Sequence, residues 1–408
     1  MNCRHCKTKL VNSFIDLGSA PPSNAFLSIK NMSEAEKWYP LHIMVCNNCW
    51  LVQTEDFVAA DEMFSADYAY FSSFSTSFLK HVKHYVDEMV ERFELDKKST
   101  VVEVAANDGY LLQYVKDQEI PCYGIEPTKS TASAARILGI DIVEEFFGYE
   151  LADKLVKNRR QADLTIANNV LAHVPDINDF VSGFRKILKN NGVATFENPH
   201  LLQLIEQKQF DTIYHEHYSY LSVTSVIEIF KTNGLTLFDV EELPVHGGSL
   251  RYFAQRSDTG ARLISDNVRK LEEKEYKAGM KDLSFYKEFQ SNAELIKTNF
   301  LSFLINQKLK RKIVVAYGAA AKGNTILNYC GIKQDLLKFV VDKNPAKQGQ
   351  CMPGSRIPIV SEKNIRDIKP DYIVILPWNL KQEIIDQLDY IYEWGGKFVV
   401  TIPKMEIL

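Results

Sequence analysis

The chain lacks an excess of charge of either sign, a long apolar run and a secretory leader pattern. Its 408 residues hold 48 Lys and Arg against 52 Asp and Glu, a net charge of -4, which disfavours a protein that holds nucleic acid mainly through phosphate contacts. No stretch approaches the roughly 18 apolar residues that span a bilayer. No basic-then-apolar signal opens the chain. We therefore expect a cytoplasmic protein, a monomer, without nucleic-acid or membrane partners.

Cysteine is scarce, and its spacing does not suggest a disulfide framework. Four of the seven cysteines form two Cys-x-x-Cys pairs: Cys3, Cys6, Cys46 and Cys49. In a reducing compartment such pairs more often bind metal than cross-link, and four thiolates can surround Zn²⁺ tetrahedrally. The pattern predicts a structural zinc site, because a closed four-sulfur shell leaves no position for chemistry. Redox or unpaired thiols are the alternative.

Regular periodicity is missing from the first 58 residues, which contain Pro21, Pro22 and Pro40. We expect a loop-rich segment in which the metal compensates for a small core. From Phe78 to Phe93, apolar residues recur at helical spacing. From Thr100 onward, short apolar runs alternate with helical patterns, which predicts a parallel sheet covered on both faces. The same rhythm restarts at Lys312, after charged helical stretches, and predicts a second, smaller α/β unit.

The G-x-G-x-x-G fingerprint of dinucleotide binding is absent from the first βα turn, where Ala105 and Ala106 stand in place of glycines. The turn is acidic instead, which suits a cationic ligand such as a sulfonium with an amino group. A carboxylate at the end of the next strand can hold two ribose hydroxyls. The candidate residues for S-adenosylmethionine are Glu103, Asn107, Asp108, Gly109, Glu126, Pro127, Asn168 and Asn169. An ordinary Asn-Asp-Gly turn with an exposed Glu is the alternative.

Two histidines, a carboxylate and two tyrosines stand together in Tyr214-His-Glu-His-Tyr218. A histidine accepts a proton near neutral pH, and an adjacent carboxylate can orient its ring, so this box is a candidate catalytic site. The i, i+2 spacing of the histidines is not the helical spacing of a metalloprotease; metal binding and polar packing are the alternatives. His173 follows a cofactor strand, where a substrate would lie, although a satisfied loop histidine is also possible.

A Walker A loop is also absent. The second glycine turn, Gly318-Ala-Ala-Ala-Lys322-Gly323-Asn324, follows a strand and opens a helix. Small residues let backbone N–H groups approach an anion, and the lysine supplies a point charge for phosphate. We expect a diphosphate-bearing substrate here; NAD and a plain tight turn are the alternatives.

These boxes, with Val245-His-Gly-Gly-Ser-Leu-Arg251 and Leu376-Pro-Trp-Asn379, occur in an order that resembles the three-domain nucleotide-sugar C-methyltransferases, which make branched deoxysugars. The resemblance covers nearly the whole chain, although Ala105 replaces the glycine usual in that family. It implies a zinc-binding domain over 1–58 and a central Rossmann-like class I methyltransferase domain with an N-terminal helical segment over 59–265. A smaller Rossmann-like α/β domain over 266–408 would bind the nucleotide diphosphate.

The resemblance also implies an activity and roles. A proton is removed beside the ketone of a nucleotide-linked keto-deoxysugar and the enolate is methylated, with C3 the expected carbon. His217 would be the general base and Glu216 would orient it. The residues that would contact the sugar and the developing oxyanion are Tyr68, Tyr70, His173 and Tyr214. The substrate-binding residues implied in the last third of the chain are Gly318, Lys322, Gly323, Asn324 and Trp378. Arg251 would meet substrate charge or form a structural ion pair.

Two other functions compete with this one. The first is an S-adenosylmethionine-dependent O- or N-methyltransferase that acts on another small molecule. The second is a zinc-ribbon interaction protein with a degenerate methyltransferase fold. The carboxylates Glu103, Asp108 and Glu126 argue against degeneration.

Overall fold

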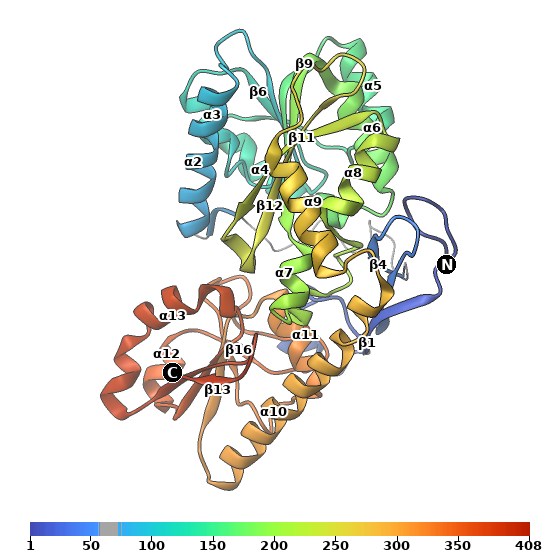
Figure 1. Ribbon diagram of the computed structural model, residues 1–408. Helices are drawn as coiled ribbons and strands as arrows, with labels where there is room; N and C mark the ends of the chain where they lie inside the picture. The colour runs from blue at the N-terminus through green and yellow to red at the C-terminus, as the bar shows by residue number, and fades with distance from the viewer. Residues whose placement is uncertain (56, 58–71, 75) are drawn as a thin grey trace.

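The computed structural model describes residues 1–55, 57, 72–74 and 76–408, so the predicted site residues Tyr68 and Tyr70 lie outside the described residues. In the described residues, sheets of four, seven and six strands organise the chain (Figure 1), and a two-stranded sheet accompanies them. A large α/β domain stands above a smaller one, and the N-terminal strands lie at the side of their junction. In the part of the chain that is described, no helix is long and apolar enough to cross a membrane.

The N-terminal segment forms an antiparallel sheet in the order β1-β3-β4-β10. Its strands are β1 (Asn12–Ala20), β3 (Tyr39–Val45), β4 (Val52–Thr54) and, from much later in the chain, β10 (Ser219–Tyr220). Loops connect these strands, as expected, but the sheet itself was not predicted. The β1–β3 register shifts between Ser13 and Ile15 and again between Asp16 and Ser19. Such irregularities break the period-two alternation by which a strand is recognised in sequence.

The central domain confirms the predicted βα rhythm. Its sheet order is β11-β12-β9-β8-β5-β6-β7. The strands are β5 (Val101–Val104), β6 (Cys122–Ile125), β7 (Asp141–Val143), β8 (Ala162–Asn168), β9 (Leu188–Pro199), β11 (Leu235–Leu243) and β12 (Ser249–Arg256). The helices are α2 (Thr76–Arg92), α3 (Leu112–Asp117), α4 (Lys129–Ile137), α5 (Tyr149–Lys157), α6 (Ile177–Ile187) and α8 (Val223–Thr232).

Strands β5 to β9 of this sheet run parallel, and β12 runs antiparallel to both of its neighbours. Every residue of β5 is buried, as expected for a strand covered by helices on both faces. The strand order reverses between β5 and β8. In open α/β sheets, ligands bind at the carboxyl ends of the strands at such a switch point. The acidic turn after β5 therefore lies at the ligand-binding edge.

The C-terminal domain is a second open sheet, in the order β16-β14-β13-β17-β18-β19. Its strands are β13 (Val314–Tyr317), β14 (Val340–Val341), β16 (Ile359–Val360), β17 (Tyr372–Ile375), β18 (Lys397–Val400) and β19 (Glu406–Ile407). Its helices are α11 (Ala321–Cys330), α12 (Lys363–Ile368) and α13 (Lys381–Gln387), preceded by the connecting helices α9 (Asp266–Ala278) and α10 (Phe289–Leu309). The switch point lies between β13 and β17 and brings the second glycine turn beside 376–379.

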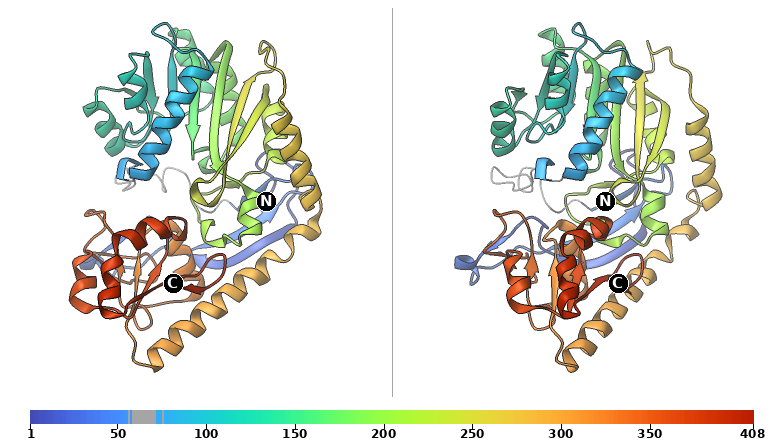
Figure 2. Two further views of the ribbon diagram at one scale, coloured as in Figure 1. Left: turned by 60° about the vertical axis from the view of Figure 1, so that its left-hand side comes forward. Right: turned by 90° about the vertical axis from the view of Figure 1, so that its left-hand side faces the viewer.

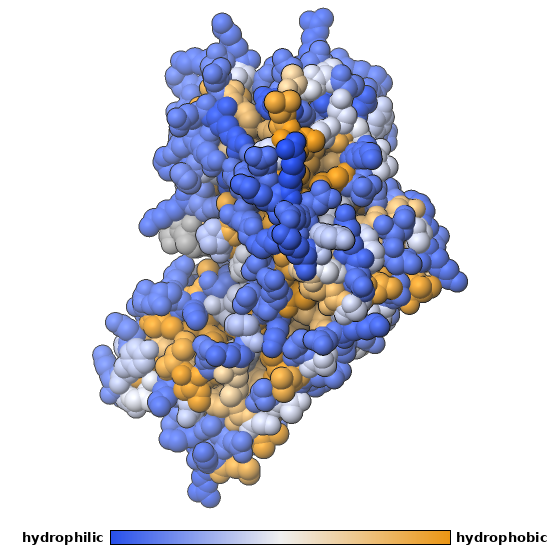
Figure 3. All heavy atoms as spheres, in the orientation of Figure 1, coloured by the Kyte–Doolittle hydropathy of each residue, from blue (hydrophilic) through white to orange (hydrophobic). Residues whose placement is uncertain are grey.

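The N-terminal segment is packed onto both larger domains (Figures 1 and 2). Phe14 stacks on Phe289 of α10 with ring centroids 4.6 Å apart, and β2 (Leu27–Ser28) pairs with β15 (Gln350–Cys351) of the C-terminal part. Polar residues cover most of the face in Figure 3, whereas apolar residues gather over the C-terminal domain. The short helix α7 (Leu201–Glu206) lies at the junction of the domains.

Candidate active site and metal centre

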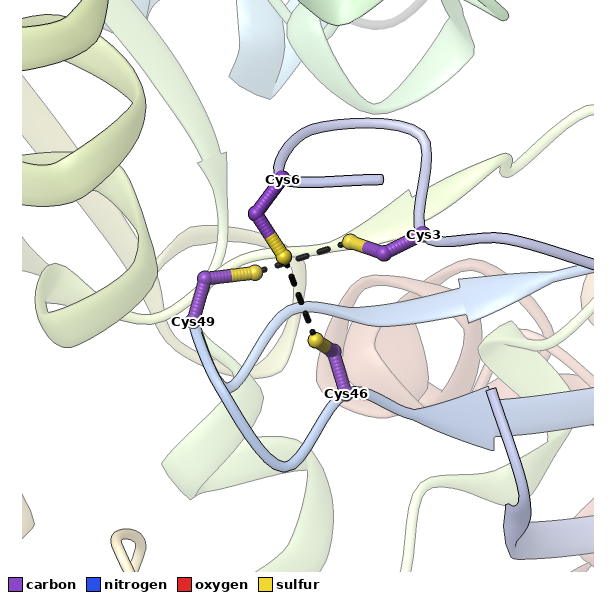
Figure 4. A group of neighbouring side chains, drawn as sticks. All are labelled: Cys3, Cys6, Cys46 and Cys49. Carbon is purple, nitrogen blue, oxygen red and sulfur yellow. Dashed lines mark hydrogen bonds between the residues drawn. The ribbon is translucent and has the colours of Figure 1, made fainter. Parts of the chain in front are cut away.

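The four cysteines of the two knuckles converge on one point. Figure 4 shows their sulfurs facing a common centre, Cys3 and Cys6 from the N-terminal loop and Cys46 and Cys49 from the turn between β3 and β4. The sulfurs of Cys3 and Cys49, and those of Cys6 and Cys46, are 3.5 Å apart, and all four lie within 4.8 Å of one another. Tetrahedral bonds of about 2.3 Å to zinc require sulfurs about 3.8 Å apart, so the residues fit the metal.

The two knuckles have the same backbone geometry. Lys7 and Trp50, which follow the second cysteine of each pair, both have φ of 61°. Each donates its N–H to the carbonyl of the first cysteine of its knuckle at 3.0 Å. This turn points two sulfurs of each knuckle to one side, as a zinc knuckle requires.

The predicted cofactor residues meet at the carboxyl edge of the central sheet. Ala105, Asn107 and Gly109 have φ of 58°, 48° and 79°, so the turn after β5 is tightly wound. Ala105 occupies the left-handed region that favours glycine, at a cost of about 1–2 kcal/mol. Glu126 directly follows β6 and accepts hydrogen bonds from Asn107 N at 2.9 Å and Thr128 N at 2.8 Å. These bonds tie the ends of the first two strands together.

Two buried acceptors at this edge, Asp108 Oδ1 and Asn168 Oδ1, lack a donor within the described residues. Burial raises the pKa of Glu103 well above its usual value and also raises the pKa of Glu126. A cationic ligand with N–H donors and ribose hydroxyls fits such a set of acceptors. When bound, S-adenosylmethionine supplies a methyl group already activated on a sulfonium.

The remaining predicted cofactor residues lie beside this set. Pro127 is half-buried between Glu126 and Thr128. Asn169 has φ of 55° and donates its N–H to Glu197 O at 2.6 Å, which ties the ends of β8 and β9 together.

The histidine box follows η4 (Phe210–Thr212) and faces the loop after β8. The rings of His173 and His217 are 4.7 Å apart, and those of Tyr214 and His217 are 3.9 Å apart. His217 Nδ1 lies 2.8 Å from Thr212 O. A carbonyl only accepts hydrogen bonds, so Nδ1 carries the proton and Nε2 is the basic nitrogen of the neutral ring.

Electrostatics keep these imidazoles uncharged. The pKa of His217 is lowered well below its ordinary value, first by burial and then by the positive charge of Lys322 and the charges that His173 and His246 carry when protonated. Burial lowers the pKa of His173 to about 4 and that of His246 to about 4. His217 therefore stands at neutral pH as an uncharged ring with Nε2 as its proton-accepting nitrogen.

The prediction that Glu216 orients His217 is wrong. Both carboxylate oxygens of Glu216 accept from Asn24 Nδ2, at 2.8 and 2.9 Å, and the backbone carbonyl of Thr212 holds the ring instead. His215 also turns elsewhere: its Nε2 lies 3.2 Å from the carbonyl oxygens of Tyr39 and Pro40. Thus only one histidine of the box stands beside His173.

Lys322 lies in the first turn of α11, and its side chain faces Trp378 and Asn379. Its Nζ donates to Asn379 Oδ1 at 3.2 Å and lies 4.6 Å from the centre of the Trp378 ring. Trp378 Nε1 donates to Asp211 Oδ2 at 2.8 Å. Burial raises the pKa of Asp211 to about 6, against the opposing charge of Lys322. The predicted lysine and tryptophan therefore form one cluster, which Asp211 completes.

Neighbouring side chains pack directly against the glycines of the second turn. A Cβ on Gly318, whose φ is +95°, would lie 2.4 Å from Pro377 Cδ, and one on Gly323 would lie 2.8 Å from Leu376 Cδ1. Asn324 is buried, and its Oδ1 accepts from Asn328 Nδ2 at 3.1 Å. The close packing explains why positions 318 and 323 are glycine, and the substrate contacts predicted for these three residues stay a prediction.

Arg251 forms structural ion pairs, the second of the two roles expected for it. Its guanidinium is 3% exposed and pairs with Glu197 and Glu88 at 3.2 Å and with Glu241 at 3.3 Å. Glu197 also bonds His81 Nε2 at 2.9 Å. The predicted contact of Arg251 with substrate charge is wrong, because three carboxylates already neutralise it.

Sequence reasoning missed several members of the site: Asn24, Thr212, Asp211 and His246. Thr212 and Asp211 precede the histidine box directly, so proximity in sequence could have suggested them. Asn24 lies 192 positions from Glu216, and no local pattern marks such a pair.

Comparison with known proteins gives the same order of three domains. Families described as a zinc binding domain, a methyltransferase domain and a C-methyltransferase C-terminal domain match residues 3–64, 78–240 and 244–403. C-methyltransferase NovU of Streptomyces niveus is 31% identical over 406 residues, which cover 100% of this chain and 96% of that protein. This full-length match replaces the O- or N-methyltransferase and interaction-protein alternatives.

Solved structures resemble only part of the chain. An S-adenosylmethionine-dependent methyltransferase from Clostridium acetobutylicum has 13% identity and a TM-score of 0.37, over 45% of this chain and 92% of that one. Magnesium protoporphyrin IX methyltransferase from Synechocystis, with S-adenosylhomocysteine bound, has 15% identity and a TM-score of 0.35, over 44% and 83%. By its full-length relative and its three matched domains, the chain belongs to the three-domain C-methyltransferase family, as an S-adenosylmethionine-dependent enzyme with a structural zinc site.

Proposed function

We propose that this C-methyltransferase acts on a keto-deoxysugar linked to a nucleoside diphosphate, and that it methylates C3 beside the ketone. One observation carries the proposal: His217, with its basic Nε2 set by the bond to Thr212 O (2.8 Å), stands in the electrostatic reach of Lys322 from the C-terminal domain. A base and a cation for phosphate are thus close enough to influence each other.

His217 takes the proton from the carbon beside the ketone onto Nε2, and the C–H electron pair becomes the enolate. A proton at such a carbon is weakly acidic, so a positioned base and a donor to the developing oxyanion are both needed. Tyr214 and His173 flank the base at 3.9 and 4.7 Å between ring centroids and are the candidate donors. The enolate carbon then forms the new C–C bond as the methyl–sulfur bond breaks.

Substrate binding strengthens the base. The positive charge of Lys322 is one cause of the lowered pKa of His217. A diphosphate bound at Lys322 neutralises that charge, so the pKa of His217 rises and its proton affinity increases in the complex. The enzyme therefore gains its full basicity only when the nucleotide part of the substrate is in place.

Proton abstraction can be tested apart from methyl transfer. In D₂O, with S-adenosylhomocysteine and a nucleotide-linked 4-keto-6-deoxysugar, the wild type should exchange the proton at C3 for deuterium, as seen by NMR. His217→Asn should lose this exchange. His215→Asn is the matched control, because that ring bonds to Tyr39 O and Pro40 O, and it should retain exchange. Unchanged exchange in His217→Asn refutes the proposed base.

A further inference from the structure

The first zinc knuckle contacts the active-site loops through one buried side chain. Arg4 lies between Cys3 and Cys6 and is 5% exposed. Its guanidinium donates from Nη1 to Pro175 O and from Nη2 to Thr54 O, both at 2.8 Å. Because the guanidinium is planar and rigid, two such bonds fix the distance between two backbone segments.

Each of these segments adjoins a histidine of the site. Pro175 follows His173 by two residues. Thr54 Oγ1 donates to His217 O at 3.1 Å, and Thr54 N donates to Tyr218 O at 3.1 Å. The two imidazoles then meet at 4.7 Å between ring centroids. The guanidinium therefore closes a ring of contacts around the histidine pair.

Two further contacts place the knuckle against these loops. The guanidinium of Arg4 lies 5.2 Å from the centre of the Tyr218 ring. His5 Nδ1 lies 2.8 Å from Asn178 Oδ1, and Asn178 Nδ2 donates to His5 O at 2.9 Å. The loop that carries His173 is thus held on both sides.

Hydrogen bonds through Gln53 also link the backbone of Arg4 to the metal ligand Cys3. Arg4 N donates to Gln53 Oε1 at 2.8 Å, and Gln53 Nε2 donates to Cys3 Sγ at 3.2 Å. Gln53 also pairs with Ser219 in the β4–β10 ladder, directly after the histidine box. Since a zinc ion fixes Cys3 and Cys6, it also fixes the backbone of Arg4 between them.

We propose that Arg4 is a positioning residue of the methyl-transfer reaction, and that the zinc centre serves catalysis by holding Arg4 against the loops of His173 and His217. The inference rests on the proposed function, in which His217 is the base. The metal then contributes geometry and no chemistry. A displacement of about 1 Å at a catalytic group can cost about 100-fold in rate.

The test replaces Arg4 by a side chain of similar length without donors. Arg4→Met should keep its zinc content and its thermal shift with S-adenosylhomocysteine. Its kcat should fall about 100-fold while KM changes less than about threefold. Lys9→Met is the matched control: Lys9 is exposed on the same N-terminal segment, so the kcat of this variant should match the wild type.

A second variant and a second readout keep the test decisive. Thr54→Val removes the hydroxyl bond to His217 O outside the knuckle and should lower kcat about tenfold with zinc retained. Hydrogen–deuterium exchange should quicken over 172–178 and 214–220 in Arg4→Met but not in Lys9→Met. Equal exchange in these two variants, or normal kcat in both Arg4→Met and Thr54→Val, overturns the inference. If the wild type does not act on the keto-sugar nucleotide, the proposed function fails, and the exchange rates still decide the role of Arg4.

Discussion

Alanine at Gly318 tests whether the second glycine turn is shaped by packing. Gly318 has φ of +95°, and a Cβ there would lie 2.4 and 2.6 Å from Pro377 Cδ and Cγ. The left-handed backbone costs an alanine about 1–2 kcal/mol. The rigid proline ring cannot rotate away, so overpacking adds about 1–3 kcal/mol. Gly318→Ala should therefore destabilise the C-terminal domain by about 2–5 kcal/mol.

Gly331→Ala supplies the control in the same domain. Gly331 has φ of +67° and no atom within 4 Å of the added Cβ, so this variant carries only the backbone cost. Urea unfolding of both variants, followed by tryptophan fluorescence and by calorimetry, gives the difference. We expect Gly318→Ala to be less stable than Gly331→Ala by about 1–3 kcal/mol. Equal midpoints would show that Pro377 yields and would refute the packing explanation.

Three further predictions concern the ligand sites. The acid limb of the pH profile of kcat/KM should have its midpoint below pH 6.5, because the base must be unprotonated and the pKa of His217 is lowered well below 6.5. A midpoint at or above pH 6.5 contradicts this. The pKa of His173 falls from 6.5 to about 4 on folding, so the unfolded state binds its proton more tightly. Unfolding free energy should decrease as pH drops from 6.5 toward 4, and urea titrations of His173→Asn should show a weaker decrease. Glu126→Gln should weaken S-adenosylhomocysteine binding about 10–100-fold by calorimetry, whereas Glu150→Gln on the exposed face of α5 should not; equal affinities would remove Glu126 from the cofactor site.

Much of the architecture was predictable because it depends on local patterns. The strands of the two α/β domains are short apolar runs between helical patterns, and burial on both faces leaves that signal intact, as in Val101–Val104. The zinc ligands were predictable because each knuckle places two sulfurs within four residues. By contrast, β1 was missed because its register shifts between Asp16 and Ser19, so its buried residues do not alternate.

The parts of the site that were mispredicted depend on distant neighbours. Glu216 is adjacent to His217 in sequence, yet its carboxylate bonds to Asn24 across 192 positions. Pro377 fills the space of a Cβ at Gly318, and no local pattern marks that neighbour either. Arg4 joins the knuckle to Pro175 over 171 positions. Sequence proximity identifies the chemical groups of a site, but the fold decides which of them meet.

The most direct measurement uses S-adenosylmethionine labelled with carbon-13 at its methyl group and a nucleotide-linked 4-keto-6-deoxysugar. Carbon NMR of the product reports where the label is bonded. We predict a methyl group on carbon, attached at C3 beside the ketone, with His217→Asn giving no labelled sugar and His215→Asn giving the wild-type product. A labelled methyl on oxygen, or no transfer to the nucleotide sugar by the wild type, would contradict the proposed function.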